Sequence, residues 1–324
     1  MKVGLTYDLR SWYLDRGYSM EDTAEFDKQN TIDALDNALK KMGFETEQIG
    51  NCFQLIEALS TGKKWDLVFN IAEGLYGDGR ESVVPAILDQ YQIPYVFSGP
   101  VILGVSLNKY LTRLIVAAAG VPVSPGIMIS AVSEIDKCTL NYPLFIKPVS
   151  EGTGKGINEK SLVKTPAELK EMATWILTRF NQPALVEEYL PGREFTVGVI
   201  GYGDDAIAIG GMEIACKDNL PYSIEFKENY QEFCKYTPLP QEYSDECKAV
   251  ALAAWKALGG VDAGRVDVKA DSTGRICFIE VNPLAGLHPI DSDLPILSRM
   301  VGIDYQTLME MIVKSSLKRH NLKL

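Results

Sequence analysis

Two stretches near the end of the chain carry carboxylates and an amide that could bind a metal ion. Each alternates polar and apolar residues, and together they flank the turn 271–274, which predicts an antiparallel hairpin. A turn centred between Ser272 and Thr273 places Arg265 opposite Glu280 and makes Asp267 the diagonal neighbour of Glu280. The face expected to carry Asp267 also holds Arg265, Ile276, Phe278, Glu280 and Asn282, and the opposite, apolar face holds Val266, Val268, Cys277, Ile279 and Val281.

This hairpin predicts a metal site made only of oxygen ligands. The carboxylates of Asp267 and Glu280 and the amide of Asn282 are hard ligands, which suit Mg²⁺ held jointly with substrate phosphates. The alternative is a solvated ladder of charges in which Arg265 neutralises both acids. The residue types alone leave both interpretations open.

A glycine-rich loop, residues 150–156, follows a strand that we expect to end at Lys147. Its closely spaced glycines let backbone N–H groups approach phosphate oxygens, and lysines supply positive charge. It is not a P-loop, because no glycine lies five residues before Gly154 and no Ser or Thr follows Lys155. A flexible surface loop is the more common meaning of such a sequence.

Acidic residues at the end of the next expected strand are candidates for nucleotide recognition. Glu187 and Glu194 could accept hydrogen bonds from adenine and ribose, with Leu190 against the base. An acidic exposed edge explains the same residues. Lys109 and Lys227 stand alone in the sequence, and lone lysines are usually just solvated.

A second glycine-rich segment, residues 73–80, follows the third expected strand. It begins with Glu73 and ends with Arg80. In an open parallel sheet the loops after the strands border the ligand crevice, so we expect this segment to contact a substrate.

The elements that must position these residues begin with a parallel sheet. Over the first hundred residues, short apolar runs alternate with helical periodicity, a pattern typical of α/β folds. The polar, aromatic segment 7–22 is too long for an ordinary turn, and we expect it to be a binding loop. The expected strands are Val3–Thr6, Phe44–Ile49, Leu67–Asn70 and Ile93–Val96, and the expected helices lie at 32–42 and 83–91.

From residue 101 onward the pattern changes to α+β. Helical stretches run to Ala119 and end at Gly120, and Thr165 to Glu168 predict a capping box at the start of another helix. Strands are expected at 123–129, 144–146, 184–190, 195–200, 206–210, 265–270 and 275–282, and helices at 246–258 and at the C-terminus. We therefore expect an N-terminal α/β domain at residues 1–100, followed by two α+β domains at 101–186 and 187–324.

Composition narrows the class of protein. The chain has 324 residues, 46% of them hydrophobic, and a net charge of −11, so nucleic acid is a poor default partner. Six cysteines without a CxxC pair indicate reduced thiols, and only two histidines nearly exclude a multi-histidine zinc site. No apolar run reaches about 18 residues, so we expect no membrane association and a cytoplasmic location.

Taken in order, these motifs resemble the ATP-grasp superfamily, and within it most closely the D-alanine–D-alanine ligases. The resemblance covers nearly the whole chain and implies an ATP site between the second and third domains. The motifs are Asn108-Lys109, Phe145-Ile-Lys-Pro148 with its glycine loop, Glu187-x-Tyr-Leu-x-Gly-x-Glu194, Gly264-Arg-Val-Asp267 and Ile279-Glu-Val-Asn282.

The resemblance implies roles for individual residues. ATP would be bound by Lys109, Lys147, Glu151, Gly152, Thr153, Glu187, Tyr189, Leu190, Glu194 and Lys227. Two Mg²⁺ ions, with Mn²⁺ as an alternative, would be held by Asp267, Glu280 and Asn282, and Arg265 with the backbone N–H of Gly286 would face an oxyanion. Glu25, Glu73, Arg80 and Ser292 would contact the substrates. The implied activity is ligation of a carboxylate to an amine through an acyl phosphate, with release of ADP and phosphate.

The departures from the family's motifs concern the substrates rather than ATP. Its His-Gly element is Glu73-Gly74 here, and its Asn-Thr-x-Pro-Gly element is Asn282-Pro-Leu-Ala-Gly286. The substrates are therefore expected to be amino acids or short peptides whose identity and chirality stay open, and the resemblance suggests a homodimer. Two alternatives remain: an ATP-binding regulatory protein without turnover, and an ATP-grasp kinase that phosphorylates a small molecule.

Overall fold

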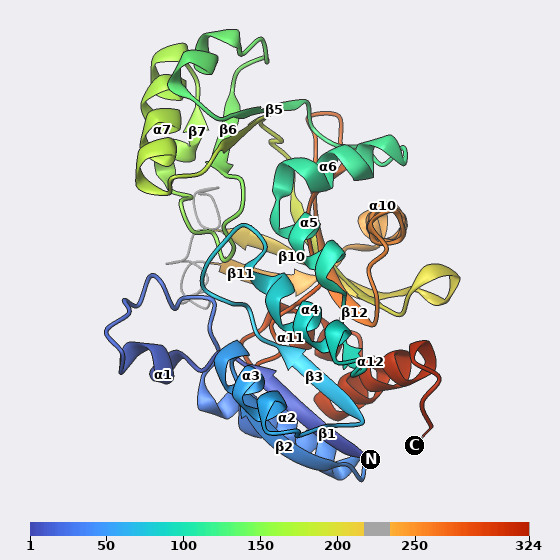
Figure 1. Ribbon diagram of the computed structural model, residues 1–324. Helices are drawn as coiled ribbons and strands as arrows, with labels where there is room; N and C mark the ends of the chain where they lie inside the picture. Colours follow the sequence, from blue (N-terminus) through green and yellow to red (C-terminus); the bar gives the residue numbers. More distant parts are fainter. Residues whose placement is uncertain (217–233, 324) are drawn as a thin grey trace.

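The described residues form three sheets, whose arrangement can be followed in Figure 1. The computed structural model describes residues 1–216 and 234–323. The combination of one parallel sheet with helices on both faces and two antiparallel sheets confirms the expected α/β and α+β class. The boundaries at residues 100 and 186 stay a prediction.

The first sheet is parallel, with strand order β2-β1-β3-β4. Helices cover both faces: α2 and the C-terminal α12 pack on one, and α3 and α4 on the other. Sequence periodicity missed α3, which begins with a full capping box between Asn51 and Gln54. The elements are β1 (Lys2–Tyr7), α2 (Gln29–Lys41), β2 (Glu45–Gly50), α3 (Cys52–Ser60), β3 (Leu67–Ile71), α4 (Val83–Gln90), β4 (Tyr95–Val96) and α12 (Tyr305–Arg319).

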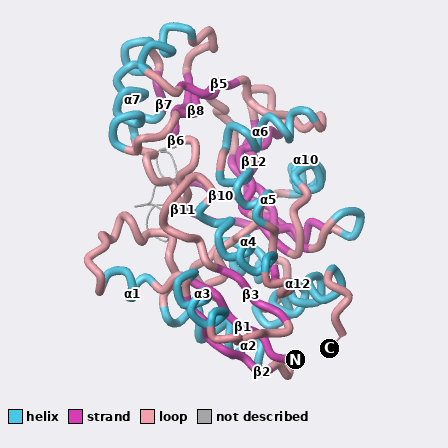
Figure 2. The backbone as a smooth tube through the Cα atoms, in the orientation of Figure 1, coloured by secondary structure: helices cyan, strands magenta, loops and turns pink. Residues whose placement is uncertain are grey.

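A long segment between β1 and α2 leaves the sheet and carries the short helix α1 (Arg10–Leu14) (Figure 2). The Tyr13 hydroxyl donates to the buried carboxylate of Asp8 at 2.5 Å, and the ring of Tyr13 packs on Phe26. The other oxygen of Asp8 accepts from the backbone N–H of Gly74 at 2.8 Å. Asp8 therefore ties this segment to the loop after β3.

The second sheet is antiparallel, in the order β5-β8-β6-β7, and α7 covers it. Thr165 caps α7 by accepting from the N–H of Glu168, but the Glu168 carboxylate accepts from Lys164, so the expected capping box is only half formed. The elements are β5 (Gly126–Ile129), β6 (Leu144–Pro148), β7 (Leu162–Val163), α7 (Pro166–Arg179) and β8 (Ala184–Glu188).

The third sheet has the order β11-β10-β9-β12-β13 and lies between the other two in Figure 1. α10 and α6 pack on one face, and α11 on the other face joins the core of the first sheet. The elements are α5 (Pro100–Leu107), α6 (Lys109–Ala118), β9 (Glu194–Ile200), β10 (Ile207–Cys216), β11 (Cys234–Pro238), α10 (Gln241–Leu258), β12 (Ala263–Ala270), β13 (Ile276–Asn282) and α11 (Asp293–Met300). Short 3₁₀ helices occur at Arg80–Ser82, Val132–Lys137, Glu159–Ser161 and Gly203–Asp205.

The β12–β13 hairpin corrects the expected register. Arg265 pairs with Asn282, and Asp267 lies directly opposite Glu280. A β-bulge inserts Ile279 as an extra residue, which shifts the alternation on β13 by one position. The prediction that Ile276 and Phe278 share the face of Asp267 is therefore wrong, because both pack in the core with Val266 and Val268.

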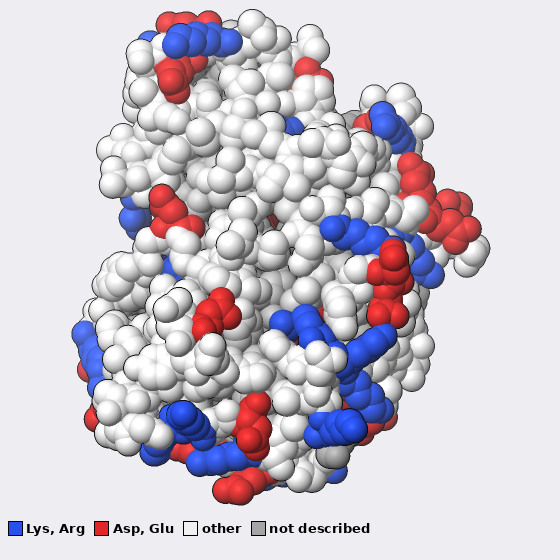
Figure 3. Space-filling model, turned by 45° about the vertical axis from the view of Figure 1, so that its right-hand side comes forward, with Lys and Arg blue, Asp and Glu red and all other residues white. Residues whose placement is uncertain are grey.

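The structure also bears on two further expectations, the state of the cysteines and the presence of membrane-spanning helices. The prediction that the cysteines are reduced thiols is wrong for Cys234, which is disulfide-bonded and lies opposite Cys216 in the β10–β11 register. Within the described ranges, no single helix is long and apolar enough to cross a membrane, although α5 and α6, bent by 105° at their junction, pass that test as a pair. Basic and acidic side chains are interspersed on the face drawn in Figure 3.

Candidate active site

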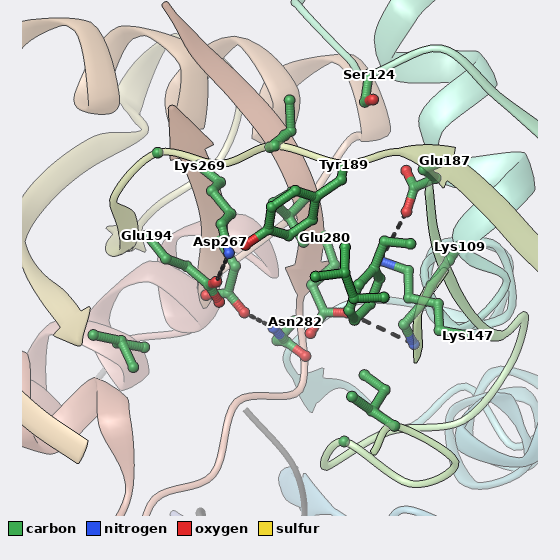
Figure 4. Close-up of a pocket in the computed structure, with 18 of the residues that line it drawn as sticks. Lys109, Ser124, Lys147, Glu187, Tyr189, Glu194, Asp267, Lys269, Glu280 and Asn282 are labelled. Atoms are coloured by element: carbon green, nitrogen blue, oxygen red, sulfur yellow. Dashed lines mark hydrogen bonds and ion pairs between the residues drawn. The ribbon is translucent and has the colours of Figure 1, made fainter. Parts of the chain in front are cut away.

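A pocket of about 380 Å³ opens between the second and third sheets. Its walls come from β6, β8, β12, β13 and the glycine-rich loop, and Figure 4 shows the side chains pointing into it. The predicted residues that line it are Lys109, Lys147, Glu151, Gly152, Thr153, Glu187, Tyr189, Leu190, Glu194, Arg265, Asp267, Glu280 and Asn282. Lys227 lies outside the described residues.

A buried group of two cations and one acid forms the wall from the second sheet. Lys147 is the last residue but one of β6, and its ammonium lies 3.1 Å from a carboxylate oxygen of Glu187 on β8. Arg113 of α6 approaches the other oxygen of Glu187 at 3.4 Å. The three groups are almost fully buried and together carry one net positive charge, and Lys147 and Glu187 line the pocket. Arg113 was missed in the sequence, where only its place on a helix could be predicted.

The glycine-rich loop bends over the pocket in the left-handed backbone region. Thr153, Gly154 and Gly156 have φ values of 52°, 71° and 78°. The Lys109 ammonium donates to the backbone carbonyl of Glu151, and the Lys155 ammonium lies 3.3 Å from the Glu151 carboxylate. These contacts hold the first turn of the loop beside α6.

The candidate metal ligands converge on the hairpin. Asp267 accepts from the Thr196 hydroxyl at 2.5 Å and from the Asn282 amide nitrogen at 3.1 Å, which leaves the amide oxygen of Asn282 available. Glu280 lies 3.7 Å from the Lys109 ammonium. Burial, opposed by the Arg265 charge and reinforced by Glu280, raises the pKa of Asp267 to about 6.

These three oxygen donors fit a hard divalent cation that completes its shell with phosphate oxygens and water. Two carboxylates brought face to face in a buried hairpin repel each other, and a cation between them removes that repulsion. Over residues 1–216 and 234–323, no group of three or more His, Cys, Asp or Glu side chains has metal-binding geometry. The protein alone therefore supplies an incomplete coordination shell.

Arg265 stands at the centre of the site with an unexpected partner. Its guanidinium pairs with Asp293, the first residue of α11, and lies 3.3 Å from Asp267. Arg265 is 9% exposed, and its Nε is buried without a hydrogen-bond partner. Asp293 was missed because it lies 28 residues away in sequence.

A second cavity of about 770 Å³ adjoins the first on the side of the N-terminal sheet. The predicted residues Glu25, Glu73, Gly286 and Ser292 line it. Gly286 is needed for a close approach, because a Cβ there would lie 2.8 Å from the Ser292 hydroxyl oxygen. That hydroxyl accepts from the backbone N–H of His288 at 3.0 Å.

Arg80 does not line this cavity but lies behind Glu25. Its guanidinium donates to the Glu25 carboxylate at 2.9 Å and to the backbone carbonyl of Ser150 at 2.9 Å. Arg80 therefore joins the loop after β3 to the glycine-rich loop. Glu81, which also lines the cavity, was missed although it follows Arg80 directly.

Residues 115–314 match the family model described as the C-terminus of D-Ala–D-Ala ligase. A D-alanine–D-alanine ligase of Granulibacter bethesdensis is 33% identical over 293 residues, which cover 86% of this chain and 89% of the relative. One from Gluconobacter oxydans is 33% identical over 259 residues, covering 78% and 82%.

Solved structures show the same fold. A D-alanine–D-alanine ligase from Bacillus anthracis complexed with ATP superposes with a TM-score of 0.74 at 24% identity, covering 99% of both chains. The VanG D-Ala:D-Ser ligase of Enterococcus faecalis superposes with a TM-score of 0.74 at 21% identity, covering 97% of this chain and 99% of that one.

The family model covers residues 115–314, and the sequence relatives cover more than three quarters of the chain. An ATP-dependent enzyme of this kind uses a divalent metal and acts on small molecules. The chain belongs to the D-alanine–D-alanine ligase family of ATP-grasp enzymes, and it is an ATP-dependent ligase that forms C–N bonds.

Proposed function

We propose that this ligase joins the carboxylate of an amino acid or short peptide to the amine of a second one through an acyl phosphate. The observation that carries the proposal is the junction between the two cavities. Arg265, Glu280 and Asn282 line both cavities, and so do Lys109 and the Gly152–Thr153 loop. A γ-phosphate in the first cavity and a carboxylate in the second would meet at these residues.

The first cavity supplies the groups that ATP requires. Lys109 and Lys147 offset phosphate charge, while the backbone of residues 151–153 covers the phosphates. Glu187, Tyr189, Leu190 and Glu194 surround the adenosine, and Lys269 holds the Glu194 carboxylate in place at 2.9 Å. Lys227 would add a further phosphate contact by its resemblance to the family.

Asp267, Glu280 and Asn282 would hold two Mg²⁺ ions, or Mn²⁺ in their place. A metal held by these residues would offset the charge that develops on the phosphoryl oxygens. Thr196 orients the Asp267 carboxylate for this role through its 2.5 Å hydrogen bond.

The reaction proceeds in two displacements. A carboxylate oxygen attacks the γ-phosphorus, the bond to the β–γ bridging oxygen breaks, and ADP leaves. The amine then attacks the acyl carbon, the C–O bond breaks, and phosphate departs with the former carboxylate oxygen while the amine loses a proton. Attack by the amine creates a tetrahedral oxyanion, which lasts until phosphate departs. Arg265 and the Gly286 N–H stabilise this oxyanion.

The proposed substrate pocket departs from the motifs of the D-alanine ligases at two places. Glu73 replaces the family's histidine, and Ala285-Gly286 replaces its Pro-Gly. Glu25 and Ser292 lie in the cavity wall, and Arg80 supports Glu25 from behind. We propose amino acids or short peptides as substrates, a homodimer as the assembly, and the cytoplasm, where ATP is made available, as the location.

The experiment measures ADP formation with Mg-ATP against amino acids and dipeptides of both chiralities, singly and in pairs, with mass spectrometry of the products. We expect ADP and a new C–N bond in equal amounts only when donor and acceptor are both present. ADP formed with one compound alone, as a stable phosphorylated product, would establish a kinase instead. An Arg265→Ala variant that turns over at the wild-type rate would contradict the oxyanion role.

A further inference from the structure

Two carboxylates from different parts of the fold hold the Arg265 guanidinium. Its Nη2 lies 3.3 Å from a carboxylate oxygen of Asp267, which is two residues further along the same strand, β12. Its Nη1 pairs with Asp293, the first residue of α11, which is 28 residues further along the chain. The side chain of Arg265 is 11% exposed and that of Asp293 is 4% exposed. Both charges therefore need a counter-charge, because a buried charge without one costs free energy.

Asp267 divides its carboxylate among several partners. One oxygen accepts from the Thr196 hydroxyl at 2.5 Å, and the other accepts from the Asn282 amide at 3.1 Å and is the oxygen that lies 3.3 Å from Arg265. A divalent cation bound to Asp267, as proposed above, would compete with the guanidinium for that oxygen. The pair with Asp293 would persist, because Asp293 is not one of the proposed metal ligands.

The backbone of Asp293 is fixed by the packing of α11. The helix begins at Asp293, and the residues that follow, among them Leu294 and Leu297, are buried in the core of the first sheet. The carbonyl of Ser292 accepts the first hydrogen bond of the helix, from the N–H of Ile296 at 3.0 Å. A carboxylate on a packed helix holds its partner more precisely than one on a loop.

The two carboxylates hold Arg265 from opposite sides of the junction between the cavities. Arg265 lines both cavities, whereas Asp267 lines the first and Asp293 lines the second. The Nε of Arg265 is buried and has no hydrogen-bond partner among the described residues, so its terminal nitrogens make the contacts that orient the guanidinium. Without Asp293, the guanidinium would keep its contact on the side of the nucleotide cavity and lose the one on the side of the substrate cavity.

We propose that Asp293 is a positioning residue, which holds the Arg265 guanidinium toward the second cavity while the C–N bond forms. This inference rests on the proposed ligase function. Asp293 acts through Arg265 and needs no contact with the substrates. Its loss should therefore slow turnover and leave nucleotide binding intact, and it should matter only while Arg265 is present.

The test measures turnover of the full chain with Mg-ATP and a donor–acceptor pair that the wild type joins, for Asp293→Asn and Arg265→Ala singly and combined. Asp293→Asn should lower kcat about tenfold or more, because a displaced catalytic group loses its contact in the transition state. The Kd of a non-hydrolysable ATP analogue, measured by calorimetry, should change less than about threefold. In the Arg265→Ala background, Asp293→Asn should cost less than about threefold in kcat, because residues that act as a unit are not additive.

Asp245→Asn is the control, because it makes the same change of charge at an exposed position of α10, and it should keep the wild-type kcat. Binding of the ATP analogue verifies that each variant is folded. If Asp293→Asn alone does not fold, comparing the double variant with Arg265→Ala still decides the question.

A wild-type kcat in Asp293→Asn would overturn the inference, and so would a further tenfold loss in the Arg265→Ala background, since a role in packing alone would add to the loss of Arg265. The proposed function fails by a different result, the absence of a C–N product from the wild type itself.

Discussion

Replacing Glu81 by glutamine should stabilise the protein, and the gain should depend on pH. Burial raises the pKa of Glu81 to about 7, and the Glu25 carboxylate adds to this effect while Arg80 and Lys109 oppose it. An acid whose pKa is higher in the folded state binds more protons there, so ionisation favours unfolding. The penalty is absent well below the unfolded pKa and grows as the pH rises toward the folded value.

The magnitude follows from the two pKa values. The change from 4.5 to about 7 corresponds to about 3 kcal/mol once the pH exceeds 7. At pH 5 the same relation leaves less than about 1 kcal/mol. Glutamine has nearly the same shape and no charge, so Glu81→Gln should recover up to about 3 kcal/mol at pH 8 and little at pH 5, which raises Tm by roughly 5 °C at the higher pH.

Thermal unfolding of the wild type and of Glu81→Gln, followed by circular dichroism from pH 5 to pH 8, tests this reasoning. Asp78→Asn serves as the control for a change of charge in the same loop at an exposed position. A difference in Tm between Glu81→Gln and the wild type that is constant across the pH range, or a less stable variant at pH 8, would refute the assignment of an unpaired recessed carboxylate.

Three further substitutions test the site and its support. Asp267→Asn removes one of the proposed metal ligands, so the Mg²⁺ concentration for half-maximal ADP formation should rise about tenfold or more, and an unchanged value would remove Asp267 from the metal site. Lys147→Met removes a positive charge that we place beside the ATP phosphates and leaves Glu187 with one cation fewer. Calorimetry should therefore show about tenfold weaker ATP binding, and an unchanged Kd would reject the contact between Lys147 and the phosphates. Gly264→Ala would place a Cβ 2.4 Å from the ring of Trp255, and urea unfolding should show a loss of about 1–3 kcal/mol from overpacking, which an unchanged midpoint would contradict.

Residue order along the chain was enough to predict the class of fold and to select most of the residues that line the first cavity. Lys147 and Glu187 lie near the ends of their strands and Asp267 lies within β12, and period-two alternation decides which side of a sheet each one faces. The place of the glycine-rich loop could be predicted in the same way, because the loop directly follows a strand. Local pattern and the order of motifs are sufficient for such residues, because their positions depend on the strand to which they belong.

The hairpin shows where local pattern fails. Two shifts displace the predicted register. The pairing beside the turn lies one residue later than expected, so Ala270 pairs with Ile276, and the extra residue Ile279 adds the second shift, although no residue type near it marks a bulge. Asp267 therefore lies directly opposite Glu280 rather than diagonally, which brings the two candidate ligands closer than the alternation predicts.

Ion pairs between residues far apart in the sequence are the second feature that local pattern could not predict. Arg265 with Asp293 and Arg80 with Glu25 join segments that are 28 and 55 residues apart. Nothing local distinguishes these charges from solvated ones. Only the packing of α11 brings Asp293 to Arg265, and only the packing of the segment before α2 brings Glu25 to Arg80.

The central claim is that ATP activates a carboxylate by phosphorylating it. The most direct measurement supplies a donor whose carboxylate carries ¹⁸O at both oxygens, together with Mg-ATP and the amine acceptor, and follows the label by mass spectrometry. The account predicts that one ¹⁸O atom from each donor consumed appears in the released phosphate. Phosphate free of ¹⁸O, alongside a labelled C–N product, would contradict it.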